Sequence, residues 1–227
     1  MHIKRFVTSN LLSFVILLLL PLQTPVPVLK EPRHHLKFEN QYVRVIDAIL
    51  PPGEATLFHT HSIDNVPVAI SGGKLKVEVM GQAGESYSTV ETGSVSFAKA
   101  AYSHRITNVG ESTARFIDAE ILSSPAGESD TGPMGKVTGY ELVLDNERVR
   151  VYRMVLEPGQ TTGLRRRGLS GLRVAVSGGQ IAVEPRGEKA RTEETGAGDF
   201  QWVAGKREYA IKNVGGARYE AIEIEWK

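Results

Sequence analysis

The sequence predicts an all-β protein built from two similar units in tandem. The chain repeats itself over most of its length, and each repeat divides into short segments that alternate apolar and polar residues between turn signals. The 23 glycines and 11 prolines supply those turns, and 41% of the residues are apolar. Several short strands at regular spacing are typical of a barrel or a sandwich.

The repeat is visible as direct sequence identity. Residues 40–73 align with residues 146–179 without a gap, and 13 of the 34 aligned positions are identical. Unrelated segments of this length would share about two. The match continues in three further pairs of segments: 91–93 with 194–196, 108–110 with 213–215, and Glu120-Ile121 with Glu223-Ile224.

We therefore expect four parts along the chain. An N-terminal segment (1–30) precedes a first barrel (36–122), and a linker rich in Ser, Gly and Pro (123–138) leads to a second barrel (139–227). Within the first barrel, KLKVEVM at 74–80 alternates cleanly, as a half-buried strand does.

The first 30 residues have the composition of an export signal. Lys4 and Arg5 precede an apolar run at 11–20, and Pro21 ends it. This run is shorter than the roughly 20 residues that a membrane span needs. No small-residue cleavage pattern follows, so a retained anchor is the alternative to a cleaved signal. The prediction is a periplasmic or secreted protein, held to the membrane only if the segment is not cleaved.

Charge and cysteine content restrict the functional classes. The chain has 27 basic and 26 acidic residues, and its longest basic run is Arg165-Arg166-Arg167, so nucleic-acid binding is not expected. No cysteine is present, which excludes disulfides and thiolate ligands. Any bound metal must therefore have nitrogen or oxygen ligands. A small molecule is the expected partner, and homo-oligomerisation stays open.

Two histidines two residues apart suggest a metal site. On a strand, His59 and His61 point to one face and Thr60 to the other. Imidazole nitrogen binds Zn, Fe, Ni, Cu and Mn. A third ligand would come from another strand, and His104 is the best candidate because it occurs late in the same repeat.

The second repeat provides an internal control for these histidines. The partners of His59 and His61 are Arg165 and Arg167, and the partner of His104 is Tyr209. The turn glycines and core valines persist in both copies, so the fold does not require histidine at these positions. Joint loss of all three is what the loss of one metal site would produce.

Two segments of the first repeat resemble the two signature motifs of the cupin superfamily. The first motif, G-x5-H-x-H-x(3,4)-E-x6-G, is matched in spacing by Gly53, His59, His61, Asn65 and Gly72. The second, G-x5-P-x-G-x2-H-x3-N, is matched by Gly93, Lys99, Ala101, His104 and Asn108. Since the resemblance extends over both repeats, the chain looks like a bicupin.

This resemblance implies a double-stranded β-helix (jelly-roll) barrel of six to eight strands in each unit. It also implies a metal in the first barrel, bound by His59, His61, Asn65 and His104, and none in the second. The family's activity at such sites includes dioxygenase-type chemistry. Three-histidine sites occur in cysteine dioxygenase-like members.

The first repeat departs from the family pattern at three positions. Lys99 and Ala101 replace the usual Pro and Gly, and Asn65 replaces the usual Glu. Asn65 is either a ligand or a hydrogen-bond partner of a ligand histidine or a bound water. Asp64 could substitute only if its loop shifted, because alternation points it the other way. Without a carboxylate the site keeps a formal +2, so we expect a divalent transition metal. Fe(II) is favoured, Zn or Ni can also bind, and Mn, a hard ion, binds more weakly.

Other residues permit two interpretations each. Phe58 and Tyr102 flank the ligands and either line a substrate pocket or pack in the core. His34 and His35 lie on a surface segment or close over the barrel mouth. Trp202 and Trp226 are expected to pack.

The arginines of the repeat also need partners. Arg165 and Arg167 either form an anion site or lie at a strand end that opens to solvent or pairs with Glu208 or Asp199. Arg44 and Arg150 recur at matched positions, which favours ion pairs with Glu120 or Glu223.

Three functions are consistent with the sequence. The first is an exported dioxygenase-type enzyme acting on a small organic acid, phenol or thiol, although no general base is identifiable. The second is a non-catalytic envelope protein that binds a metal or small ligand. The third is an oligomerisation scaffold in which the histidines are vestigial.

Overall fold

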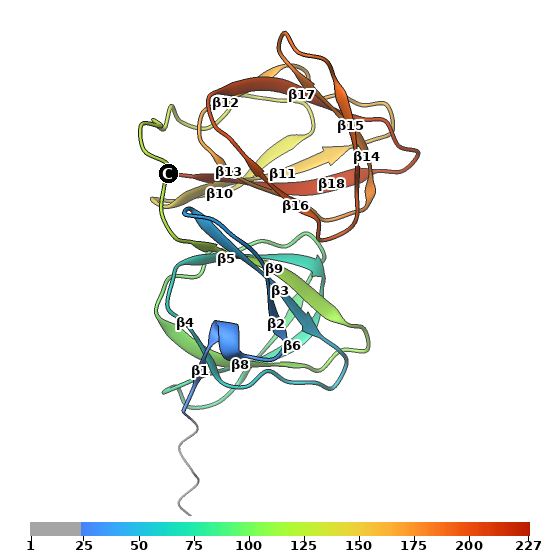
Figure 1. Cartoon of the computed structure of the whole chain (residues 1–227). Coiled ribbons are helices and arrows are strands. Elements are labelled where there is room, and N and C mark those ends of the chain that lie inside the picture. Colours follow the sequence, from blue (N-terminus) through green and yellow to red (C-terminus); the bar gives the residue numbers. More distant parts are fainter. Residues whose placement is uncertain (1–23) are drawn as a thin grey trace, which may run out of the picture.

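Two β-barrels stacked one on the other make up the computed structural model, which describes residues 24–227 (Figure 1). Most of the predicted export segment, residues 1–23, lies outside the described residues. Among residues 24–227, no helix is both long and apolar enough to span a bilayer.

The first barrel consists of two sheets that enclose an interior. One sheet has the order β1-β4-β8-β6-β7 and the other has the order β2-β3-β9-β5. Their strands are β1 (Val26–Pro27), β2 (His34–Glu39), β3 (Val43–Leu50), β4 (His59–His61), β5 (Asn65–Ser71), β6 (Gly73–Val79), β7 (Ser86–Val90), β8 (Tyr102–Asn108) and β9 (Ala114–Ile121), and a 3-10 turn η1 covers Val28–Lys30.

The second barrel repeats this plan. Its sheets have the orders β10-β11-β18-β13-β16 and β12-β17-β14-β15. Its strands are β10 (Tyr140–Asp145), β11 (Val149–Leu156), β12 (Arg165–Arg167), β13 (Gly171–Ala175), β14 (Gly179–Pro185), β15 (Arg191–Thr195), β16 (Phe200–Val203), β17 (Arg207–Asn213) and β18 (Tyr219–Trp226). The predicted all-β fold with two jelly-roll barrels is confirmed.

Strand register fixes the correspondence between the two copies. His59 pairs with His104 and Arg165 pairs with Tyr209, as the sequence alignment predicts. The predicted match of Glu120 with Glu223 is wrong. Arg44 lies opposite Glu120, and the equivalent Arg150 lies opposite Glu225, so β18 is two residues out of the predicted register. The counterpart of Glu223 is therefore Asp118.

The main apolar core lies between the barrels. Alternate residues of β9 and β18 point out of their own barrels and pack together with those of neighbouring strands. Tyr42 stacks on Trp202, and Trp202 contacts Trp226 edge-on, which confirms that both tryptophans pack. The buried residues of this core include Val43, Val45, Val66, Val68, Ile117, Ala119 and Ile121 from the first barrel and Val149, Val151, Leu172, Val174, Ile222, Ile224 and Trp226 from the second.

A shared asparagine explains why NVG recurs in both copies. The amide of Asn108 donates to the carbonyls of Leu50 and Ser112. The amide of Asn213 makes the same two bonds, to Leu156 and Ala217. Both asparagines are fully buried, so they hold a turn of the barrel rather than contribute to a site.

Residues 24–33, which we call the N-terminal arm, lie against the first barrel. The arm pairs in parallel with β4, with the Val26 N–H donating to the Phe58 carbonyl, and η1 follows. The arm leads into His34 at the start of β2. Residues 26–30, predicted to belong to the export segment, are thus part of the folded unit.

Because one apolar core joins the two barrels, we expect Ile224→Ala to lower the free energy of unfolding of the whole protein by about 2–5 kcal/mol. Ile224 is fully buried in that core, whereas Leu164 is 56% exposed. Urea unfolding followed by fluorescence measures the change. Leu164→Ala, the control, should shift the free energy by no more than about 0.5 kcal/mol. A small effect of Ile224→Ala would contradict this account of the interface.

Candidate metal centre

Antiparallel pairing of β4 with β8 brings three histidines together inside the first barrel. His59 lies directly opposite His104, and His61 points the same way as His59 because they are two apart on one strand. The Nε2 atom of His59 lies 3.0 Å from that of His104 and 3.2 Å from that of His61. All three predicted histidines therefore converge through the same ring nitrogen.

This spacing suits a single metal ion. Two imidazole nitrogens bound to one metal at tetrahedral or octahedral angles lie about 2.8–3.4 Å apart, given metal–nitrogen bonds of about 2.0–2.1 Å. Burial lowers the pKa of His59 to about 4, of His61 to about 2 and of His104 to about 3, with neighbouring histidines adding to the shift. The rings are therefore neutral near pH 7 and keep the lone pairs that a metal needs.

Backbone contact fixes the tautomer of His59. Its Nδ1 lies 2.9 Å from the Leu57 carbonyl, which can only accept a hydrogen bond. Nδ1 therefore carries the proton, and Nε2 presents its lone pair to the other two rings.

A fourth histidine, for which the sequence left a surface segment and the barrel mouth open, lies in the same cluster. His34 stands at the start of β2, and its side chain is only 6% exposed. One ring nitrogen from each of His34, His59 and His61 lies within 4.8 Å of the other two. The neighbouring His35 is exposed, as predicted. The alternative that this segment closes over the barrel mouth is thus correct for His34.

The buried carboxylate of Glu31 holds His34. Glu31 Oε2 lies 2.5 Å from His34 Nδ1 and accepts from the Arg33 N–H, while Oε1 accepts from the Leu57 N–H. Burial alone would raise the pKa of the Glu31 carboxyl, but these hydrogen bonds together lower it below its ordinary value. Nothing in the sequence pattern drew attention to Glu31.

Asn65 lies behind His61, on the side away from the Nε2 atoms. Its amide nitrogen is 2.9 Å from His61 Nδ1 and 2.9 Å from Asp118 Oδ2. The ring of Tyr102 stacks on that of His61 at 4.9 Å. Asn65 and Tyr102 thus fix the orientation of His61. In this orientation the amide NH2 donates to Nδ1 of His61; a metal on Nε2 would require the half-turn that presents the amide oxygen to a protonated Nδ1.

Asp118 is a site residue that sequence reasoning missed. It projects from β9 into the barrel and is 4% exposed. Its Oδ2 accepts from Asn65, whereas its Oδ1 has no hydrogen-bond partner among residues 24–227. Burial, opposed in part by the positive field of His34, raises the pKa of the Asp118 carboxyl to about 7. Counting the inward positions of the closing strand could have found it, since Asp118 is two residues from Glu120.

A cavity of about 140 Å³ adjoins the histidines. Asp118, Asn65 and Tyr102 line its polar side together with three of the histidines. The rest of the wall is mostly apolar and consists of Ala48, Leu50, Thr56, Pro67, Leu75, Ile106 and Phe116.

Two residues considered from sequence lie elsewhere. Phe58 is not brought to the cavity, because alternation on the strand turns it outward, where the Arg105 guanidinium lies 5.0 Å over its ring. Asp64 accepts from the Ala100 N–H and pairs with Arg148, away from the histidines.

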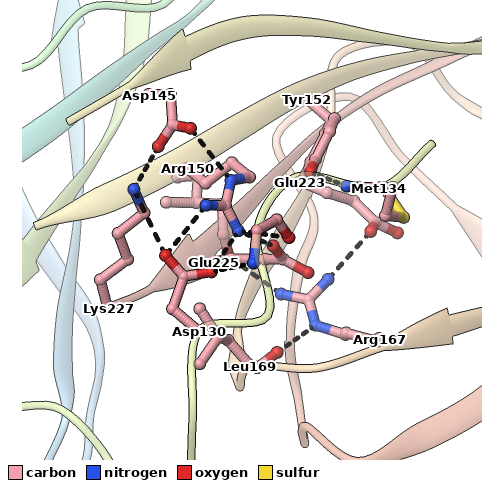
Figure 2. Close-up of polar contacts among 12 residues, drawn as sticks. Asp130, Met134, Asp145, Arg150, Tyr152, Arg167, Leu169, Glu223, Glu225 and Lys227 are labelled. Carbon is pink, nitrogen blue, oxygen red and sulfur yellow. Dashed lines mark hydrogen bonds and ion pairs between the residues drawn. The ribbon is translucent and has the colours of Figure 1, made fainter. Parts of the chain in front are cut away.

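The equivalent positions of the second barrel hold a closed ion cluster. Arg165 and Arg167 stand at the positions of His59 and His61, and both bind Glu223, at 2.5 and 2.9 Å. Tyr140 donates to the other oxygen of Glu223, and Tyr209 bonds Arg165. We call these five residues the Glu223 cluster. Figure 2 shows Arg167 extending between Glu223 and the Leu169 carbonyl.

These contacts correct the predicted partners of the arginines. Arg165 and Arg167 do not pair with Glu208 or Asp199; they are buried and share Glu223. Burial would raise the pKa of Glu223, but the two guanidiniums hold it below its ordinary value.

The prediction for Arg44 is confirmed, since it binds Glu120 at 2.7 Å. Its counterpart Arg150 does not bind Glu223. It binds Asp130 of the linker and Asp145, and Figure 2 shows both contacts.

No family of known proteins and no curated protein matches the sequence. Solved structures do match the fold. AerE from Microcystis aeruginosa superposes with a TM-score of 0.66 and 15% identity over 89% of this chain and 98% of AerE. Oxalate decarboxylase from Bacillus subtilis gives a TM-score of 0.61 and 13% identity over 82% and 68% of the two chains. At these identities the likeness establishes the fold alone, which is the cupin fold present twice.

We expect Glu223→Gln to destabilise the protein by about 3–5 kcal/mol, because it leaves two buried guanidiniums without their anion. Chemical denaturation measures the loss. Glu208→Gln is the matched control, since Glu208 pairs with the largely exposed Arg186 and such pairs contribute about 0–1 kcal/mol. Equal effects of the two substitutions would contradict the assigned role of Glu223.

Proposed function

We propose that the first barrel binds one divalent transition metal through His59, His61 and His104 and oxidises a small molecule held in the adjoining cavity. The observation that carries this proposal is the clustering of imidazoles around His59. Its Nε2 lies 3.2 and 3.0 Å from the Nε2 atoms of His61 and His104, and His34, His59 and His61 each offer a nitrogen within 4.8 Å of the others. The depth of the cluster adds support, since His59 and His61 are 0% and 2% exposed. At an exposed site, water molecules would compete with the substrate for the open coordination positions of the metal.

The donor set favours particular metals. Imidazole nitrogen suits Fe, Zn, Ni and Cu, whereas Mn and Mg prefer carboxylate and water oxygen. The carboxylate Asp118 lies behind Asn65 and does not lie among the Nε2 atoms. We therefore expect Fe(II) or Zn to bind more tightly than Mn. Bound Fe(II) would supply a Lewis acid and an electron donor for reaction with dioxygen.

The cavity narrows the substrate class to a phenol or a thiol. Its volume of about 140 Å³ is close to the 150 Å³ of an engineered apolar cavity that binds benzene. No Lys or Arg lines it, and the Asp118 carboxyl does. A carboxylic acid would face Asp118 without a cationic partner in the wall, so organic acids fit less well than molecules with one O–H or S–H donor.

The residues around the cavity have separable roles in this proposal. Asp118 Oδ1, which lacks a partner in the described chain, accepts a hydrogen bond from the bound hydroxyl or thiol and receives its proton. Asn65 and Tyr102 hold the His61 ring with its Nε2 toward His59. The apolar wall, with Leu75 and Phe116, excludes water from the bound molecule.

The second barrel has a supporting role in this proposal. The Glu223 cluster fills the place of the metal site with side chains that satisfy one another, so no metal is expected there. Its sheet completes the core against which β9 packs. The predicted export segment makes the periplasm or the exterior the proposed compartment.

We expect His59→Ala to abolish metal binding, because His59 is the one histidine whose Nε2 contacts both others. Elemental analysis of untagged protein purified without chelator, before and after anaerobic Fe(II) loading, measures the metal content. Thr60→Ala is the matched control, since Thr60 lies on the opposite face and bonds Ser103. Unchanged metal content in His59→Ala would refute the site. Metal binding without oxygen consumption across a panel of phenols and thiols would instead favour the non-catalytic binding protein.

We expect Asp118→Asn to weaken the binding of phenol by roughly 5–150-fold, which corresponds to about 1–3 kcal/mol for a buried hydrogen bond to a charged acceptor. Titration calorimetry on the metal-loaded protein measures this affinity. Phe58→Ala, on the outer face, should leave the affinity unchanged. Equal losses in the two variants would show that the cavity is not the binding site.

A further inference from the structure

We propose that His34, at the start of β2, is the fourth metal ligand, and that Glu31 at the end of the N-terminal arm positions it. This inference rests on the proposed metal site in the first barrel. His34 lies outside both segments that resemble the cupin motifs, and those motifs imply a Glu rather than a histidine as the fourth ligand. The structure places Asn65 at that position.

The geometry of His34 is that of a ligand. Its Nδ1 is engaged by Glu31, which leaves Nε2 as the nitrogen available to the cluster. Its ring centroid lies 4.5 Å from that of His59 and 6.1 Å from that of His61, and the ring lines the same cavity. A buried imidazole nitrogen needs a partner, and a metal held by the other rings would provide it.

Glu31 is built to orient this histidine. It is 2% exposed, and its two oxygens accept from His34 and from two backbone N–H groups. A ligand histidine that donates its other nitrogen to a carboxylate is the usual arrangement at metal sites, because the carboxylate fixes the ring and increases its basicity. Glu31 thereby brings one negative charge close to the metal, which Asn65 cannot do.

The second repeat shows that the fold does not need Glu31 or His34. The register that pairs His34 with Ala48 pairs Tyr140 with Met154, so Tyr140 is the counterpart of His34. The N–H of each donates to the carbonyl three residues earlier, at 3.1 Å in both copies, and that residue is Glu31 in one and Val137 in the other. The turn is the same without a carboxylate.

All four histidine positions therefore change together between the barrels. The histidines at 34, 59, 61 and 104 correspond to Tyr140, Arg165, Arg167 and Tyr209. Each of these four replacements belongs to the Glu223 cluster. Tyr140 thus occupies the place of the metal site in the second barrel together with the other three replacements. The fourth position follows the same pattern, which assigns His34 to the site.

The arm has further attachments to the barrel. Val28 is buried, the Arg33 guanidinium binds Glu54, and the Arg33 carbonyl accepts from the Ile49 N–H. Its strand β1 covers two residues, and among the arm's contacts the Val26 N–H bonds the Phe58 carbonyl. Glu31 and His34 link its far end to the cluster. We therefore expect loss of the metal, or of His34 as a ligand, to increase amide exchange at Arg33 and His34, whose N–H groups donate to Glu31, and to leave the pairing of Val26 with β4 intact.

The test compares His34→Ala with His35→Ala, two adjacent histidines of which one faces the cluster and one faces solvent. Chelator competition with Co(II) or Zn(II) measures affinity in the full folded protein, and X-ray absorption of the Co(II) form counts imidazole ligands. His34→Ala should still bind one metal, at least 10-fold more weakly and with three imidazoles instead of four. Glu31→Gln should weaken binding by about 10-fold or more, and His35→Ala should match the parent.

Circular dichroism of the metal-free variants, with His34→Gln as a second substitution that keeps a similar side-chain length, separates loss of fold from loss of a ligand. Parent-like affinity and four imidazoles in folded His34→Ala would overturn the inference, and the three-histidine site would stand if His59→Ala still abolished binding. Absence of metal from the parent protein would overturn the proposed function itself.

Discussion

Strict alternation along the closing strands β9 and β18 is the constraint on which the rest of the structure depends. One face of each strand contributes to the apolar core that joins the barrels, and this fixes which residues turn inward. The inward positions are acidic in both copies: Asp118 and Glu120 in β9, and Glu223 and Glu225 in β18. Each barrel therefore has buried carboxyl groups that face its interior. Each must supply hydrogen-bond donors or positive charge to offset the cost of burying them.

The two barrels meet this requirement differently. In the second, guanidiniums from β12 neutralise Glu223 directly, and the site is closed. In the first, Arg44 neutralises Glu120, but Asp118 accepts from the Asn65 amide, lies 3.5 Å from His61 Nδ1 and faces a cavity without an Arg or Lys in its wall. The strand that supplies arginine in one copy supplies histidine in the other. In the first barrel, a metal bound by the histidines would supply the positive charge. The O–H or S–H of the bound small molecule would donate a hydrogen bond to Asp118.

The sequence was sufficient to predict the fold and the three central histidines of the candidate site. It was not sufficient to predict the residues around them. Gap-free identity between the copies predicts two barrels, and the spacing of His59, His61 and His104 predicts their convergence. His34 could not be placed, because it reaches the cluster through the pairing of β2 with β3, and the gap-free match between the copies begins only at residue 40. The repeat held a signal that was not used, since His34 aligns with Tyr140. Asp118 was missed because the register of β18 was set two residues wrong, which hid its equivalence to Glu223.

The Glu223 cluster also limits how the two copies can change over evolutionary time. Placing histidine at Arg167 alone would leave a buried network short of one cation, and replacing Glu223 first would leave two unpaired guanidiniums, each step costing several kcal/mol. Contributions within such a network are strongly non-additive, so no single substitution is a neutral first step. The second barrel therefore resists any stepwise exchange of these arginines for histidines, and its inward face is committed to a closed ion network.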